Sequence, residues 1–327
     1  MTEHPAGGPP TPADVQAAAA RIKGQGRVTP VLSDPDLDEQ LGFRVFFKCE
    51  NLQRTGAFKF RGACNAVRRL DERGVQGDVA THSSGNHGAA LALAARLSGR
   101  KAHIVMPENA LASKFDNVRR NGGEVHECEA SQAAREAGLE RLVDEQGCVP
   151  IPPYDHADVI AGQGTAALEL LAQVDGLDAL ITPVGGGGLV SGCALAAQTA
   201  RTPPRVYAAE PAGADDTARS VQAGRRVTDI RPDTVCDGLR AIVGVLNFEL
   251  IARHVSAVFT VQDPDTVSAM RTLRHHLGLL VEPSSSLVLA ALLAERERFE
   301  GQRVGVILTG GNLDLAHLPD GFLDERD

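Results

Sequence analysis

Short apolar runs alternate with longer helical segments along most of this chain, and this alternation constrains the fold more than any other feature. Seven runs rich in Val, Ile and Ala have the length of buried strands: residues 79–83, 102–106, 124–126, 179–184, 205–209, 257–261 and 304–308. Segments with helical periodicity lie between or after them: residues 86–97, 112–121, 132–145, 158–174, 189–200, 264–277 and 284–299. The pattern predicts an α/β fold with mostly parallel sheets, whose ligands bind at the carboxyl ends of strands.

Clusters of proline and glycine predict where the chain divides into domains. Pro150, Pro152 and Pro153 mark one junction, and glycines within residues 74–77 mark another. We therefore predict a small domain of residues 78–152, inserted into a large domain of residues 13–77 and 153–327. Residues 1–12 are rich in Pro and Gly and lack the basic and apolar regions of a signal peptide, so they predict a flexible tail.

The composition excludes several classes of protein. The 327 residues are 43% hydrophobic and 23% charged, which excludes disorder of the whole chain. With 33 basic against 42 acidic residues the formal charge is -9, which argues against nucleic acid and membrane surfaces as partners. No apolar run approaches the ~20 residues that span a bilayer. Six widely spaced cysteines without a C-x-x-C pair favour a reduced, cytoplasmic protein that acts on small molecules.

One lysine has the surroundings of a nucleophile. An apolar run at residues 45–47 predicts a strand, and the sequence T-G-A-F-K-F follows it and enters a helix that ends near residue 73. Lys59 therefore lies in the first turn of a helix, where the helix dipole and the flanking Phe58 and Phe60 favour a neutral amine. A Schiff base with a carbonyl cofactor requires such an amine. The alternative is a surface lysine between two core aromatic residues.

A polar turn, T-H-S-S-G-N-H-G at residues 81–88, separates a predicted strand from an Ala-rich helix. Its backbone N–H groups, together with Ser and Asn side chains, can form a cradle for a carboxylate. Asn86 can also hydrogen-bond a phenolic oxygen. The alternative is a simple helix cap, because Ser and Asn are common capping residues.

A glycine turn follows strand 179–184 and precedes a helix. It consists of four consecutive residues: Gly185, Gly186, Gly187 and Gly188. Here the backbone can approach a phosphate closely, with the helix dipole behind it. A dinucleotide turn competes, because Glu210 lies near the position of its acidic residue, but Val190 or Ser191 occupies the place of its last glycine. A phosphate cup fits better.

Two further strand ends carry polar residues. Strand 205–209 runs into the turn E-P-A-G-A-D-D, where two carboxylates and a carbonyl can converge on a hard cation. The alternative is a solvated acidic turn that binds nothing. Strand 304–308 runs into T-G-G-N, where the hydroxyl of Thr309 can face a ring nitrogen. A plain turn is equally consistent with that sequence.

Together these stretches resemble the pyridoxal-phosphate (PLP) enzymes of the tryptophan-synthase-β fold, called fold type II. The match is closest to the serine racemases and the related serine/threonine dehydratases. It rests on T-G-A-F-K-F-R, S-S-G-N-H, G-G-G-G and T-G-G-N in this order, over nearly the whole chain. The resemblance implies a two-domain α/β fold, pyridoxal 5'-phosphate as cofactor, an amino acid as substrate and a homodimer.

The resemblance also implies a role for each candidate residue. Lys59 forms the Schiff base with the cofactor, and the other cofactor-binding residues are Phe58, Asn86, Gly185, Gly186, Gly187, Gly188 and Thr309. Ser84 is the acid/base on the face opposite Lys59. The substrate-binding residues are Ser83, Ser84, Asn86, His87 and Arg135. A divalent cation, Mg²⁺, Mn²⁺ or Ca²⁺, is held by Glu210, the carbonyl of Ala214 and Asp216.

The predicted function is a PLP-dependent serine/threonine dehydratase with serine racemase activity through Ser84. A hydroxyl at Thr309 cannot keep the pyridine nitrogen protonated as a carboxylate does, which discourages transamination and leaves elimination or reprotonation at Cα. Ile242 replaces a small hydroxyl residue of serine racemases, which suits another β-hydroxy amino acid such as 3-hydroxyaspartate or phenylserine. The alternatives are a catalytically silent nucleotide-binding protein and a β-replacement synthase of the same fold.

Overall fold

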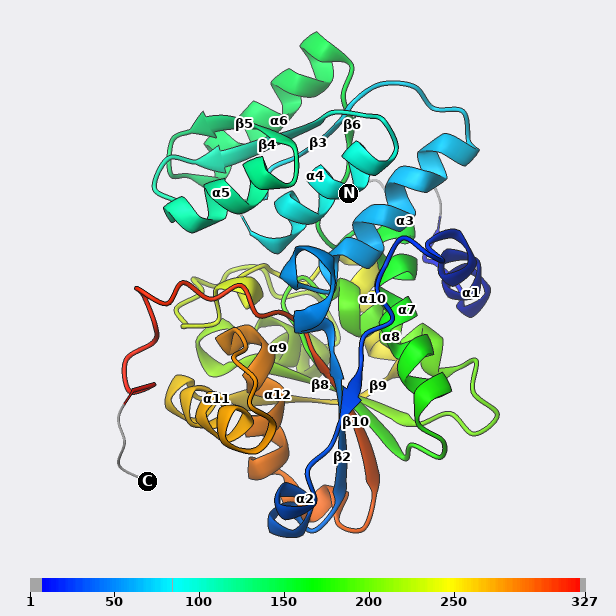
Figure 1. Cartoon of the computed structure of the whole chain (residues 1–327), viewed down its shortest axis with the longest axis vertical. Helices are drawn as coiled ribbons and strands as arrows, with labels where there is room; N and C mark the ends of the chain where they lie inside the picture. Colours follow the sequence, from blue (N-terminus) through cyan, green and yellow to red (C-terminus); the bar gives the residue numbers. More distant parts are fainter. Residues whose placement is uncertain (1–7, 84, 324–327) are drawn as a thin grey trace.

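The computed structural model describes residues 8–83 and 85–323, and it contains two sheets stacked along the long axis of the molecule (Figure 1). The large sheet has the strand order β1-β2-β10-β7-β8-β9. Its strands are β1 (Val31–Leu32), β2 (Arg44–Cys49), β7 (Ala179–Pro183), β8 (Arg205–Pro211), β9 (Val255–Val261) and β10 (Arg303–Leu308). All its neighbouring pairs are parallel except β1 with β2.

The small sheet has the order β5-β4-β3-β6 and is parallel throughout. Its strands are β3 (Val79–Thr81), β4 (Ala102–Pro107), β5 (Gly123–Cys128) and β6 (Val149–Pro150). The four strands all come from residues 79–150, inside the predicted inserted domain; the exact domain limits stay a prediction.

Helices cover both faces of the large sheet, which is why its strands are apolar on both sides. On one face α1, α7, α8 and α10 bury residues such as Leu180 and Ile307. On the other, α2, α11, α12 and α13 bury residues such as Ile181 and Val306. The helices are α1 (Pro12–Arg21), α2 (Pro35–Leu41), α3 (Lys59–Glu72), α4 (Asn86–Leu97), α5 (Ala112–Arg120), α6 (Gln132–Gln146), α7 (Ala157–Gln173), α8 (Gly188–Ala197), α9 (Asp216–Ala223), α10 (Val245–His254), α11 (Asp263–Leu277), α12 (Pro283–Ala294) and α13 (Arg296–Phe299).

The predicted α/β class with mostly parallel sheets is confirmed, and the differences are local. The helix expected over residues 284–299 is divided into α12 and α13, because Glu295 leaves helical geometry with φ -105° and ψ 20°. Strand β3 ends at Thr81, two residues before the expected end. Strands β1 and β6 have only two residues each, too short for an apolar pattern to predict. Among the described residues, no helix has the length and hydrophobicity to cross a bilayer.

Candidate active site

The predicted site residues meet at the carboxyl ends of the large-sheet strands, on the side that faces the small sheet. The first turn of α3 is tied to the end of β10: the N–H of Phe58 donates to the carbonyl of Thr309 at 3.0 Å, and Ala57 pairs with Gly310 in an antiparallel bridge. The glycine turn follows β7 and Glu210 ends β8. The parallel topology thus brings residues more than a hundred positions apart to one edge of the sheet.

Lys59 has the properties that its sequence position predicts. It is the first residue of α3, and its Nζ donates a hydrogen bond to the carbonyl of Pro153 at 2.9 Å. Burial lowers the pKa of the Lys59 amine to about 8. The amine lies 5.2 Å from the ring centroid of the buried Phe58. A carboxylate does not offset the burial, so the neutral, nucleophilic form is populated near neutral pH.

The glycine turn forms a cradle that side chains would fill. A Cβ on Gly186 would lie 2.3 Å from the ring of Tyr154, and one on Gly185 would lie 2.9 Å from Cα of Leu239. Gly187 has φ +91°, which disfavours other residues. Within the described chain, the N–H groups of Gly185, Gly186 and Gly187 donate no hydrogen bond although these residues are buried, and α8 begins at Gly188. Unpaired N–H groups at a helix N-terminus fit a phosphate.

Asn86 and His87 open α4 beside this cradle. Nδ2 of Asn86 donates to both carboxylate oxygens of Glu282 at 3.0 Å, and its Oδ1 accepts from Nδ2 of Asn312 at 2.7 Å. Nε2 of His87 lies 3.0 Å from the carbonyl of Ile151, so this nitrogen carries the proton. Burial, together with the charge of Lys59, lowers the pKa of His87 to about 3. Its Nδ1 is then a buried acceptor without a partner in the described structure.

Glu282 is a site residue that the sequence analysis missed. Besides the Asn86 contacts, its Oε1 accepts a hydrogen bond from the N–H of Asn312 at 2.9 Å. Burial, then the charge of Asp237, raises the pKa of Glu282 to about 7. The available signal was a lone carboxylate between Val281 and Pro283, directly before the apolar helix α12.

The acidic turn after β8 brings two buried carboxylates together. Glu210 is fully buried and accepts from the N–H groups of Thr217 and Ala218, at 3.2 and 2.6 Å. Asp216 accepts from the N–H of Val243 at 2.8 Å. Burial, together with the neighbouring charge of Asp216, raises the pKa of Glu210 to about 8, and burial raises that of Asp216 to about 6. Two carboxylates with raised pKa values around the buried Ala214 fit a divalent cation.

The remaining substrate-binding candidates lie around the turn before α4. Ser84 lies outside the described residues. Ser83 is half-buried, and its carbonyl would lie 2.3 Å from a Cβ on Gly88, so this turn packs closely on α4. Arg135 lies in α6 and donates to Oε1 of Gln132 at 2.6 Å. Its charge, after burial, contributes to a lowered pKa of His82, which places Arg135 on the side of this turn.

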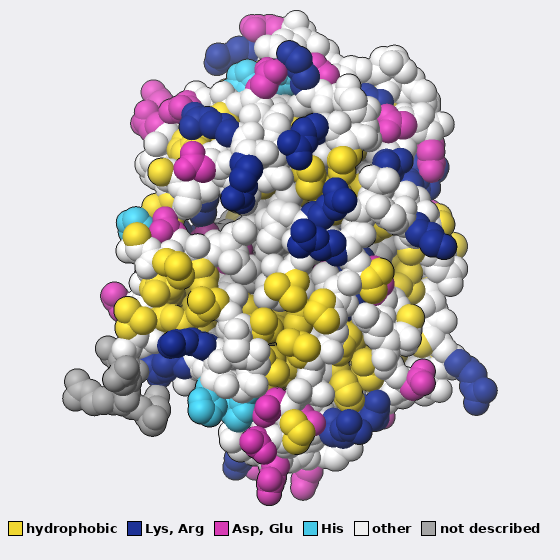
Figure 2. Space-filling model, in the orientation of Figure 1, with side chains coloured by type: hydrophobic (Ala, Val, Ile, Leu, Met, Phe, Trp, Pro, Cys, Tyr) yellow, Lys and Arg dark blue, Asp and Glu magenta, His cyan; other side chains and the backbone are white. Residues whose placement is uncertain are grey.

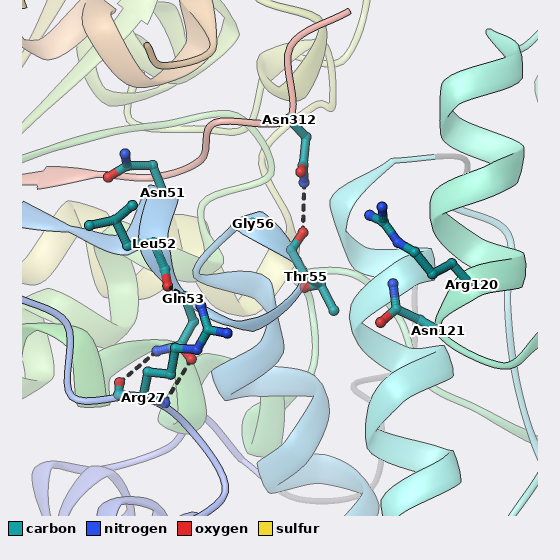
Figure 3. A pocket seen from close by; sticks show the side chains of 9 residues that line it. All are labelled: Arg27, Asn51, Leu52, Gln53, Thr55, Gly56, Arg120, Asn121 and Asn312. Atoms are coloured by element: carbon teal, nitrogen blue, oxygen red, sulfur yellow. Dashed lines mark hydrogen bonds between the residues drawn. The ribbon is translucent and has the colours of Figure 1, made fainter. Parts of the chain in front are cut away.

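A polar cavity of about 400 Å³ opens next to the Asn86–Asn312 contact (Figure 3). Asn312 reaches into its wall, where Nδ2 donates to the carbonyl of Thr55 at 2.7 Å. The lining residues come from both sides of the molecule: Arg27, Asn51, Leu52, Gln53, Thr55, Gly56, Arg120, Asn121 and Asn312. The cavity borders the candidate site without containing Lys59 or the glycine turn.

Residues 22–310 match the family model described as pyridoxal-phosphate dependent enzyme. The chain belongs to this family. It is 48% identical to β-hydroxyaspartate dehydratase of Paracoccus denitrificans, over 95% of this chain and 98% of the relative. It is 45% identical to the serine racemase of Arabidopsis thaliana, over 95% and 96% of the two chains. The solved structure of maize serine racemase superposes with a TM-score of 0.91 at 44% identity, covering 94% of this chain and 95% of the other.

The family confirms the predicted PLP cofactor and fold type II, and it decides against a catalytically silent nucleotide-binding protein. The residues present fit the cofactor on structural grounds: Lys59 offers a buried amine of lowered pKa, and the glycine turn offers unpaired N–H groups at the start of α8. The site residues were thus predicted from sequence with two gaps, Glu282 and the position of Ser84.

Proposed function

We propose that the protein is a PLP-dependent ammonia-lyase that converts a β-hydroxy amino acid to a 2-oxo acid and ammonia. The observation that carries this proposal is the buried amine of Lys59, held by the carbonyl of Pro153 at 2.9 Å in the same site as the glycine turn. The names of the relatives, a β-hydroxyaspartate dehydratase and serine racemases among them, support this class of reaction.

Bound pyridoxal phosphate supplies an electron sink that makes the Cα proton of the substrate removable. Lys59 takes that proton from one face, because its pKa of about 8 suits a base near neutral pH. The turn Gly185–Gly188 holds the phosphate, and Phe58 packs on the ring. The hydroxyl of Thr309, neutral at all relevant pH values, lies opposite the ring nitrogen and favours elimination over transamination. The side chains of Asn86 and His87 orient the ring oxygen and the substrate carboxylate.

Racemase activity would require a second acid/base on the opposite face, and we assign this role to Ser84. Its hydroxyl can return a proton to Cα from the side away from Lys59. The similarity to serine racemases of Dictyostelium discoideum at 43% identity and of Arabidopsis thaliana at 45% supports this assignment.

A second candidate substrate is 3-hydroxyaspartate. The dehydratase of Paracoccus denitrificans named for this substrate class is 48% identical to the chain, and an L-threo-3-hydroxyaspartate ammonia-lyase of Pseudomonas is 44% identical. This substrate carries a second carboxylate, which needs a cation. Arg135 in α6 is the residue that we assign to it, because its charge already acts on His82 in the turn before α4.

The deciding experiment compares L-serine, L-threonine and the isomers of 3-hydroxyaspartate, with the 2-oxo acid and the D-amino acid followed in one tube. Lys59→Ala should lose the Schiff-base absorption and all turnover; retention of both would overturn the proposal. Ser84→Ala should lose the D-amino acid while elimination persists. Arg135→Gln should lower kcat/KM for 3-hydroxyaspartate by about 10–100-fold and change that for L-serine little. A product that forms only with an added thiol would instead indicate a β-replacement synthase.

We further propose that Glu210, the carbonyl of Ala214 and Asp216 hold Mg²⁺, Mn²⁺ or Ca²⁺. An all-oxygen donor set suits these hard cations, and a cation would offset the repulsion between the two buried carboxylates. Asp216→Asn should then abolish any thermal stabilisation by Ca²⁺. The homodimer and the cytoplasmic location stay predictions.

A further inference from the structure

Two histidines and a carboxylate gather in the small sheet, away from the candidate active site. They lie on the neighbouring parallel strands β4 and β5, where His103 is paired in register with Glu124, and Val105 with His126. Residues two apart on a strand share a face, so His103, Glu124 and His126 all project from the same face of the sheet. One ligand atom from each residue lies within 4.8 Å of the others.

The distances among these atoms match those of ligands around one ion. Nδ1 of His103 lies 3.0 Å from Nε2 of His126 and 3.5 Å from Oε2 of Glu124. Ligand atoms bound tetrahedrally at about 2.0–2.1 Å from a metal lie about 3.3 Å from each other. Two neutral imidazoles can also share one hydrogen bond at 3.0 Å, but such a pair does not require the carboxylate on the same nitrogen.

The groups around the cluster also suit a metal site. Oδ2 of Asp78 lies 3.8 Å from Nε2 of His103, the nitrogen that faces away from the cluster. Such a carboxylate behind a metal-binding histidine orients the ring and raises its basicity. Lys101 contacts Oε1 of Glu124 at 3.0 Å and leaves the other oxygen to the histidines. His103 is buried, whereas Glu124 is exposed and His126 half-buried, so an ion and a water ligand can enter from solvent.

We propose that His103, Glu124 and His126 form a binding site for a divalent transition-metal ion, with water as the fourth ligand. Imidazole nitrogens select Zn²⁺, Co²⁺, Ni²⁺ or Cu²⁺ over Mg²⁺ and Ca²⁺. The site therefore differs in metal preference from the oxygen-donor turn of Glu210 and Asp216.

The position of the cluster gives the ion a structural role. His103 and Glu124 are each the second residue of their strand, at the amino ends, whereas the turn with Ser83 and Asn86 follows the carboxyl end of β3. Figure 1 shows β4 and β5 side by side in the upper part of the molecule, and Figure 2 shows histidine surface among acidic and basic side chains there. Strand β5 is an edge strand, so the ion would join it to β4 by ligands from both.

The test is a titration of the chelator-treated holoenzyme with Zn²⁺ by calorimetry and with Co²⁺ by visible absorption. The wild type should bind one ion per chain with the spectrum of tetrahedral Co²⁺, in the presence of excess Mg²⁺. His126→Gln should weaken Zn²⁺ binding at least 100-fold, and Asp78→Asn about tenfold. Zn²⁺ should raise the melting temperature of the wild type and leave that of His126→Gln unchanged.

Matched variants separate this site from others. His254→Gln, a histidine at the end of α10, should bind Zn²⁺ as the wild type does, and so should Asp216→Asn. Since His126 is half-buried, its variant should fold, which its cofactor absorption and circular dichroism check. Equal Zn²⁺ affinity in wild type and His126→Gln, or no binding to the wild type, would overturn the proposal and leave the two histidines as a hydrogen-bonded pair.

Discussion

At the scale of single residues, the site contains charges that folding makes costly. Burial lowers the pKa of Lys59 to about 8 and raises that of Glu282 to about 7. Neither residue has an oppositely charged side chain in direct contact among the described residues, since Lys59 donates to a backbone carbonyl and Glu282 accepts from amides. A reactive site can tolerate such groups because the bound cofactor and substrate supply the missing charges.

Glu282 should make stability depend on pH in a defined direction. Its pKa rises from 4.5 to about 7 on folding, so the folded state holds the proton more tightly and loses stability as pH rises through this window. Between pH 4.5 and 7, the free energy of unfolding of the cofactor-free wild type should fall by about 3 kcal/mol relative to Glu282→Gln. Urea unfolding at several pH values measures this, with Glu295→Gln as an exposed control. A constant difference between the two proteins would contradict it.

The glycine turn should reject even one methyl group. In Gly186→Ala the new Cβ would meet the Tyr154 ring at 2.3 Å, so the turn or the ring must move. We expect the affinity for pyridoxal phosphate to fall at least tenfold, because the unpaired N–H groups leave their positions. Gly26→Ala is the matched control, since its Cβ would have no neighbour closer than 3.8 Å. Cofactor release measured by absorption decides, and unchanged affinity in Gly186→Ala would show that the phosphate binds elsewhere.

At the scale of elements, a buried ionic network fixes α3, the helix that carries Lys59. Arg61 donates to both oxygens of Glu50 at 2.7 and 2.8 Å and to both oxygens of Glu169 at 2.9 and 2.7 Å. Lys48 of β2 adds a contact to Glu169 at 2.8 Å. The network joins β2, α3 and α7, so the start of α3 is held against the sheet and against its neighbouring helix.

Removing Arg61 should therefore destabilise the protein strongly. In Arg61→Met, Glu50 remains fully buried without its cation, which costs about 3–5 kcal/mol of unfolding free energy. Arg69→Met, which breaks the exposed contact with Glu72, should cost less than about 1 kcal/mol. Chemical denaturation compares the two variants. Equal effects would mean that the buried network does not stabilise α3.

At the scale of the whole molecule, a few polar contacts connect the small-sheet half to the large-sheet half across the site. Lys114 of α5 contacts Asp237 at 2.5 Å, and Ser113 donates to Asp314 at 3.0 Å. The apolar clusters of the two sheets are separate. The two halves therefore meet over the site mainly through groups that water can also satisfy, which permits their separation when substrate enters or product leaves.

Breaking the Lys114 contact should change catalysis more than stability. Both side chains are partly exposed, so Lys114→Met should cost less than about 1 kcal/mol of unfolding free energy. Because the contact bridges the two halves, we expect KM for the amino acid to rise several-fold, and added salt to raise KM of the wild type in the same direction. Steady-state kinetics with a thermal melt tests both. A lower melting temperature with unchanged KM would assign a purely structural role to the pair.

The sequence by itself determined the class of the fold and most of the candidate site. Alternating apolar periods encode strand and helix locally, and motifs such as T-G-A-F-K-F and G-G-G-G place their chemistry at strand ends, where a parallel sheet gathers it. Lys59, Asn86, the glycines and Thr309 could therefore be named before their distances were known. The two-residue strands and the break at Glu295 could not, because pairing partners and packing define them rather than local pattern.

Only the tertiary structure decided which polar residues share surroundings. Glu282 meets Asn86 across 196 positions, and Arg61 meets Glu169 across 108, and no local signal encodes either contact. His103 and His126 are ordinary residues in the sequence and become neighbours only through the register of β4 with β5. Burial, which sets the pKa values of Lys59 and Glu282, is likewise a property of the packed molecule, since it depends on what covers a side chain rather than on its neighbours along the chain.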